Sequence, residues 1–143
     1  MKHATVTEAH QLQQKGATYV DVRSTAEFNA GHPEGAVNVP LLEPDDSGQM
    51  APNPDFVRVM KSAFDPGTQL LIGCQAGVRS LKAAQMLETF GFTDVTNVRG
   101  GFGGARDQSG APVEGWTTAG LPVETGAPAD RRYDTLLQNA DNA

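Results

Sequence analysis

The side chain best suited to chemistry in this sequence is that of Cys74, the only cysteine in the chain. It follows the apolar run 70–73 and precedes a short loop that contains Gly77, after which helix-forming residues begin. Loop amides and the positive end of the following helix favour a thiolate, the nucleophilic form of a cysteine. We therefore expect Cys74 to ionise more readily than a free cysteine and to act as a nucleophile, rather than to serve as a small buried apolar group.

Short apolar runs alternate with helix-like patterns along the chain and position this cysteine. Strands are predicted over residues 17–22, 36–39, 68–73 and 94–98. Helices are predicted over residues 7–16, 24–31, 56–64 and 81–91. Residues 43–54, rich in Pro, Asp, Ser and Gly, are predicted to be a surface loop. This alternation predicts an α/β domain with a mostly parallel sheet.

Polar or glycine-rich residues follow three of the predicted strands. Residues 21–23, Cys74 and residues 99–101 all stand at strand carboxyl ends. In parallel α/β sheets, sites form at this edge. We therefore expect these three segments to share one rim of the sheet.

Length and composition exclude several classes of function. One cysteine allows neither an intramolecular disulfide nor a multi-cysteine metal site, and we expect no metal and no cofactor. The net charge of −6 argues against a nucleic-acid partner. The sequence has no apolar run of about 18 residues and no apolar signal core, so we expect no membrane partner and a cytoplasmic location.

The length of 143 residues predicts one domain. We place it at residues 1–124, followed by a polar C-terminal segment at 125–143. Tyr133, Leu136 and Leu137 in that segment indicate either one short docking helix or a frayed end.

Three motifs together resemble the rhodanese (thiosulfate sulfurtransferase) family in its single-domain form. Residues 21–40 are similar to that family's N-terminal signature, and residues 74–80 to its active-site loop. Gly100-Gly101-Phe102, followed by Trp116 and residues 120–123, is similar to its C-terminal signature. The resemblance runs from about Thr5 to Val123. The chain departs from the family pattern in an insertion at residues 103–115, which leaves the shape of one wall of the site open.

The resemblance implies a three-layer α/β fold with about five strands and a sulfane-sulfur transfer through a Cys74 persulfide. The sulfur would come from a small anionic donor such as thiosulfate and pass to cyanide, a thiol or a protein acceptor. The alternative is a sulfur-relay or interaction module that docks on a specific protein partner. The loop would hold the sulfur and the departing anion through Gln75, Ala76, Gly77, Val78, Arg79 and Ser80.

Loop length separates sulfur transfer from phosphoryl transfer. Cys74 to Arg79 spans six residues, a Cys-x4-Arg pattern. Related phosphatases and arsenate reductases on this fold have one residue more. A smaller ring of amides suits a single sulfur atom better than a tetrahedral phosphate, so we favour sulfur transfer.

Several further residues have supporting roles in this interpretation. Arg79 contacts an anionic donor or pairs with a carboxylate such as Glu27, and the sequence leaves both roles open. Asp21 and Arg23 are expected to brace the loop, with direct substrate contact as the alternative, and His32 to hold the fold together rather than to act as a catalytic base. The remaining expectations are that Phe102 lines the pocket mouth or the core edge, that Trp116 packs the last helix, and that His3 and His10 are solvated.

Overall fold

A central five-stranded sheet organises the computed structural model, which describes all residues from 1 to 143. Its strand order is β1-β8-β7-β2-β4, and every neighbouring pair is parallel. The strands are β1 (Lys2–Ala4), β2 (Thr18–Asp21), β4 (Val37–Asn38), β7 (Leu70–Gly73) and β8 (Val95–Val98). The predicted α/β class with a mostly parallel sheet of about five strands is confirmed.

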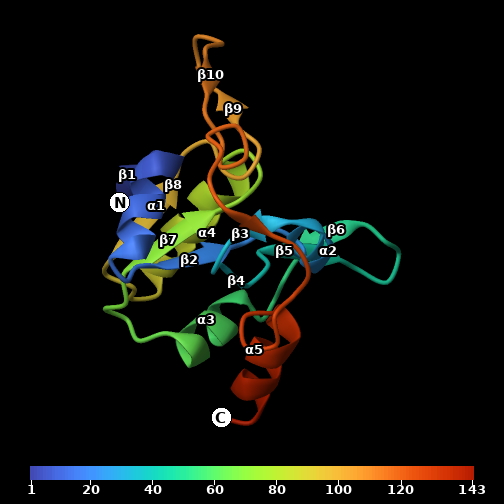
Figure 1. The fold of residues 1–143 in the computed structure, drawn as a ribbon. Helices are drawn as coiled ribbons and strands as arrows, with labels where there is room; N and C mark the ends of the chain where they lie inside the picture. The colour runs from blue at the N-terminus through green and yellow to red at the C-terminus, as the bar shows by residue number, and fades with distance from the viewer.

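Helices cover both faces of this sheet and form the outer two layers (Figure 1). They are α1 (Val6–Gln14), α2 (Thr25–Ala30), α3 (Phe56–Ala63), α4 (Val78–Thr89) and α5 (Tyr133–Asp141). Alternate residues of a strand point to opposite faces. Val20 and Ile72 accordingly pack with α3, α4 and α5 in a core of 17 buried residues, which also contains Cys74. Tyr19 and Leu71 pack with α1 and α2 in a second core of nine.

Two helices near the N-terminus begin with capping boxes. Thr5 accepts from the Glu8 amide and Glu8 caps the Thr5 amide, so α1 begins at Val6, one residue before the predicted start at Thr7. Ser24 and Glu27 form the same arrangement at α2, which ends at Ala30 with Gly31 as its C-cap. The second box fixes the segment directly after β2, at the carboxyl edge of the sheet.

Two antiparallel hairpins lie outside the central sheet. One of them, formed by β5 (Leu42–Pro44) and β6 (Met50–Pro52), occupies most of the predicted surface loop at 43–54 and begins one residue before it. The insertion at 103–115 contains the other, formed by β9 (Ala105–Arg106) and β10 (Pro112–Val113). This second hairpin projects from the body of the molecule in Figure 1.

Trp116 is completely buried, but not against the last helix. Its ring lies edge-on to Tyr19 and His10, at centroid distances of 5.4 and 5.5 Å, and its Nε1 donates to the Pro122 carbonyl at 2.6 Å. The prediction that Trp116 packs the last helix is wrong, because the chain returns over the α1 face. The prediction for His10 is also wrong, since the Trp116 ring half-buries it, whereas His3 is exposed.

The segment after Glu124 passes to the face of the sheet opposite the one that Trp116 covers. α5 contributes Tyr133 and Ala140 to the larger core and lies beside α3 (Figure 1). Tyr133 also receives a hydrogen bond at its hydroxyl from Asn53 at 3.0 Å. No helix in the chain is both long and apolar enough to cross a membrane.

Glu124 links the segment around His32 to the segment that precedes α5. It lies on β11 (Val123–Glu124), which pairs with β3 (His32–Pro33). Its carboxylate accepts from His32 Nε2 at 2.9 Å, from the Gly35 amide at 3.0 Å and from Arg131. His32 is fully buried and contacts the Phe28 carbonyl with its other ring nitrogen at 2.7 Å, which supports a structural role for this histidine. The Arg131 hydrogen bond lowers the pKa of Glu124 from 4.5 to about 2.

We expect Glu124→Gln to lower the free energy of unfolding by about 2 kcal/mol near neutral pH, the scale of a hydrogen bond to a charged group. Because the folded-state pKa is depressed, this stabilisation is present above pH 4.5 and is lost as the pH falls through about 2. Urea unfolding of both proteins at a series of pH values measures the difference. Glu114→Gln, at an exposed position, is the matched control. A difference that stays constant from neutral pH to below pH 4 would contradict this account.

Candidate active site

Cys74 lies at the carboxyl end of β7, the middle strand of the sheet. The side chain is only 2% exposed, and its Sγ accepts a hydrogen bond from the Gly77 amide at 3.0 Å. Gly77 has φ 106°, a left-handed conformation that glycine adopts without strain. The chain therefore curls back over the sulfur within three residues.

The N-terminus of α4 follows the sulfur directly. Gly77 occupies the N-cap position and has no side chain to cap the helix, which begins at Val78. The amides of the first helical turn are therefore left without a side-chain partner. Such amides, together with the helix dipole, favour an anion. Val78 itself is 79% exposed and stands on the surface beside the buried sulfur.

Ser80 and Asn97 form a polar chain beneath the sulfur. The Ser80 Oγ lies 3.4 Å from Cys74 Sγ, and the Ser80 hydroxyl donates to Asn97 Oδ1 at 2.8 Å. Ser80 is completely buried and Asn97, on β8, is 5% exposed. Asn97 Nδ2 lies 3.4 Å from Nδ1 of the exposed His3.

Arg79, in the first turn of α4, forms an ion pair with Glu27 of α2. Its guanidinium donates to both carboxylate oxygens of Glu27, at 2.7 and 3.1 Å. This contact lowers the pKa of Glu27 from 4.5 to about 2 and raises the pKa of Arg79. Of the two roles that the sequence leaves open, the structure shows the ion pair, which ties α4 to α2.

Arg23 forms a second, more deeply buried pair with Asp21. Its guanidinium donates to the carboxylate at 2.7 Å and to the Gly31 carbonyl at 2.6 Å, and only 3% of the residue is exposed. Arg23 also donates to Gln75 Oε1 at 3.2 Å and lies 4.4 Å from the centre of the Phe102 ring. These contacts brace the loop at Gln75, and the charge of Arg23 is neutralised within the protein.

The glycines after β8 allow the chain to press against the cysteine loop. The Phe102 amide donates to the Cys74 carbonyl at 2.8 Å, and the Gly103 amide to the Gln75 carbonyl at 3.0 Å. A Cβ at Gly101 would lie 2.4 Å from the Cys74 carbonyl oxygen, so only glycine fits there. The base of the β9–β10 hairpin is thus attached directly to the loop.

Comparison with known proteins identifies the family. The model of the rhodanese-like domain matches residues 5–107. This chain belongs to the rhodanese-like domain family. The resemblance seen in the sequence is thereby confirmed, and the match ends inside the insertion.

Relatives of this rhodanese-like domain include a named sulfurtransferase. Thiosulfate sulfurtransferase 16, chloroplastic, of Arabidopsis thaliana is 39% identical over 84% of this chain and 90% of that protein. Senescence-associated protein DIN1 of Raphanus sativus is 42% identical over 83% of this chain, which spans only 58% of that protein. The crystal structure of Rv0390 from M. tuberculosis has a TM-score of 0.69 and 27% identity, covering 87% of this chain and 100% of that chain.

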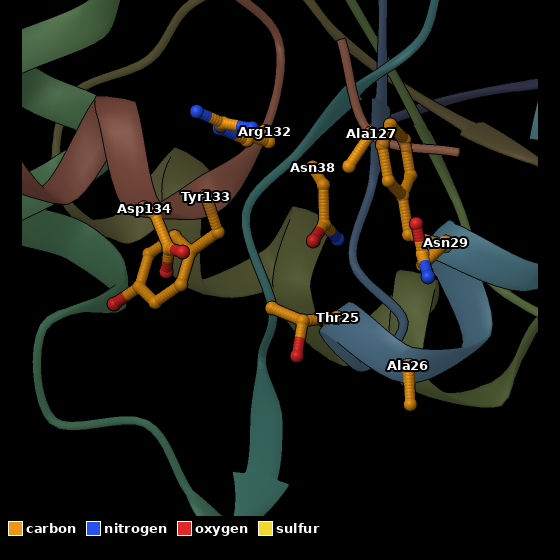
Figure 2. A pocket seen from close by; sticks show the side chains of 9 residues that line it. Thr25, Ala26, Asn29, Asn38, Ala127, Arg132, Tyr133 and Asp134 are labelled. Carbon is orange, nitrogen blue, oxygen red and sulfur yellow. The ribbon is translucent and has the colours of Figure 1, made fainter. Parts of the chain in front are cut away.

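One hollow of this rhodanese-like domain adjoins the cysteine loop and another lies apart from it. A cleft of about 330 Å³ lies beside the cysteine loop. Its lining consists of Arg23, Glu27, Ala30, Gly31, Gln75, Phe102 and Val123. A second cavity, of about 290 Å³, lies between α2 and the start of α5, and Asn38 stands on the chain segment between these two helices (Figure 2). The Asn38 amide donates to the carbonyls of Asp21 and Arg23, so it supports the strand end and contributes no nucleophile.

The predicted site residues fall into two groups in space. Residues 74–77 form the loop, and Val78, Arg79 and Ser80 form the first turn of α4. Arg23 contacts the loop at Gln75 and Phe102 contacts it at the Cys74 carbonyl, whereas Asp21 acts on it through Arg23. His32 lies instead at the β3–β11 junction. Asn97 was not predicted, although a polar side chain between Val95 and Val98 of a buried strand signals that it needs a buried hydrogen-bond partner.

Proposed function

We propose that this protein is a sulfurtransferase that carries a sulfane sulfur as a Cys74 persulfide. The observation that carries the proposal is the position of Cys74 Sγ, which accepts from the Gly77 amide at the uncapped N-terminus of α4. This environment favours a thiolate without a general base. The six-residue loop and the named sulfurtransferase among the relatives support the same chemistry.

In the first half-reaction, the Cys74 thiolate attacks the outer sulfur of thiosulfate. A new S–S bond forms at Cys74, and the bond between the outer sulfur and the sulfonate breaks. Its electron pair leaves with sulfite, so the negative charge of the thiolate passes to the outer sulfur of the persulfide. The free amides of the first turn of α4 are available to bind the charged sulfur and the departing anion.

In the second half-reaction, a nucleophilic acceptor takes the outer sulfur. Cyanide would form a bond to this sulfur while the persulfide S–S bond breaks, which yields thiocyanate and returns the Cys74 thiolate. A small thiol or a protein thiol would react in the same way. Because Cys74 is only 2% exposed, the acceptor has to reach the sulfur that projects from it.

The retained cysteine favours catalysis over docking on a partner alone. The cytoplasmic location stays a prediction, since several relatives are named as chloroplastic.

We expect the protein to convert thiosulfate and cyanide to thiocyanate and to leave para-nitrophenyl phosphate unhydrolysed. Phosphoryl transfer places three equatorial oxygens among donors, and a six-residue loop offers too few amides in too small a ring. Each missing oxyanion donor typically costs about 2.7–4 kcal/mol of transition-state stabilisation. Colorimetric detection of thiocyanate and of para-nitrophenol in parallel samples measures both activities.

A variant with one glycine inserted after Gly77 provides the matched comparison. The longer loop should weaken sulfur transfer, because it moves the Gly77 amide away from the sulfur. Phosphate hydrolysis by the unmodified protein that disappears in Cys74→Ser would overturn the loop-length argument and favour a phosphatase.

A further inference from the structure

The hydrogen bonds beneath Cys74 have a direction. A serine hydroxyl has one proton to donate, and Ser80 gives it to Asn97 Oδ1 at 2.8 Å. The Ser80 oxygen therefore presents lone pairs to Cys74 Sγ at 3.4 Å and accepts from the thiol. This arrangement suits the protonated sulfur, because a thiolate has no proton to give.

Donation from Ser80 to a Cys74 thiolate requires the Ser80 hydroxyl to reverse. A thiolate is best stabilised when Ser80 donates to it, but this would remove the donor of Asn97 Oδ1 inside the protein. Ser80 is completely buried and Asn97 is 5% exposed, so an unpaired polar group here is costly. The two ends of a carboxamide have nearly the same shape. Rotating that of Asn97 by half a turn directs Nδ2 to the Ser80 oxygen and Oδ1 to His3.

We propose that Asn97 is a positioning residue for the nucleophile, whose carboxamide rotates so that the Ser80 hydroxyl can donate to the Cys74 thiolate. His3 is the outermost member of this row of hydrogen-bonded side chains. Its Nδ1 can pair with either end of the Asn97 carboxamide, because an imidazole nitrogen can either accept or donate a hydrogen bond. The contact of 3.4 Å to Asn97 is therefore satisfied in both orientations. The consequence for sulfur transfer rests on the proposed function, whereas the effect on the thiol does not.

Other titratable groups also surround this sulfur. Tyr19 from β2 and Arg79 from α4 lie close enough to interact electrostatically with Cys74. Arg79 is paired with Glu27, and the Arg23–Asp21 pair lies at the neighbouring strand end. Because these groups stay constant in the variants below, a change in reactivity reports the Ser80–Asn97 chain.

The test is the pH dependence of alkylation by iodoacetamide, which reports Cys74 alone because it is the only cysteine. In Asn97→Asp, the carboxylate can accept from Ser80 but cannot donate to it, so the hydroxyl stays turned from the sulfur. We expect the alkylation midpoint to rise by about one pH unit or more, the scale of one lost hydrogen bond to a charged group. In Asn97→Leu, the hydroxyl loses its acceptor at Asn97 and is free to turn to the sulfur, so we expect the midpoint to fall.

The double variant Ser80→Ala/Asn97→Asp, compared with Ser80→Ala, separates the hydroxyl from the added charge. We expect less than half of the Asn97→Asp shift to remain without the hydroxyl. An equal shift in both backgrounds would overturn the proposal, as would Asp and Leu variants that move the midpoint in the same direction. If Asn97→Asp does not fold, a raised or unchanged midpoint in Asn97→Leu is sufficient to overturn it. Thiocyanate formation by the wild-type protein is measured separately and tests the proposed function alone.

Discussion

Cys74→Ser is expected to abolish sulfur transfer while the protein stays folded. A serine hydroxyl is a far weaker nucleophile than a thiolate at neutral pH, and no general base contacts this position to activate it. The hydroxyl is close in size to the thiol and retains two polar partners, the Gly77 amide and the Ser80 hydroxyl. Thiocyanate formation measures the activity, and circular dichroism with thermal unfolding measures the fold.

The fold measurement serves as the control for this prediction. A variant with a wild-type melting temperature and no detectable turnover would support Cys74 as the nucleophile. A folded variant that still turned over thiosulfate and cyanide at the wild-type rate would show that the reaction does not pass through this sulfur.

Gly101→Ala should have the second largest effect, because it displaces the loop that carries the nucleophile. The new Cβ would lie 2.4 Å from the Cys74 carbonyl oxygen and 2.8 Å from the Gln75 carbonyl carbon. Both are backbone atoms, so the loop has to move away. Since misplacing reacting groups by about 1 Å can cost about 10²-fold in rate, we expect at least a tenfold loss of turnover. Initial rates and thermal unfolding of the purified variant measure both effects.

Gly110→Ala is the matched control for this substitution. Gly101 has φ 56° and Gly110 has φ 84°, so both substitutions place a side chain in the left-handed region. Gly110 lies in the β9–β10 hairpin and has no atom within 4 Å of its Cβ position. The control should retain the wild-type rate. Equal rates for the two variants would show that the contact at Gly101 does not position Cys74.

The order of elements could be predicted from local patterns because the central strands are strongly apolar. β7 is buried along its whole length and is followed by a glycine loop and an amphipathic helix, which places Cys74 at a strand end. β1 was not predicted, since its residues Lys2 and His3 are exposed and carry no apolar pattern. It becomes a strand only by pairing with β8.

The contacts of single side chains were harder to predict than the elements. The sequence does not show to which face of the sheet the chain returns, so the predicted packing of Trp116 on the last helix is wrong. The sequence is compatible with two roles for Arg79. Only the structure shows that its guanidinium lies 2.7 Å from the Glu27 carboxylate. Glu124 and Asn97 act through partners more than 85 positions away in the sequence, Glu124 with His32 and Asn97 with His3.

The central claim is that Cys74 carries a sulfur atom covalently between two half-reactions. The most direct test is the intact mass of the protein after it is mixed with thiosulfate and freed of small molecules. We expect a gain of one sulfur atom in the wild-type protein, reversed by cyanide, and no gain in Cys74→Ser. An unchanged mass during active turnover, or an equal gain in Cys74→Ser, would contradict the account.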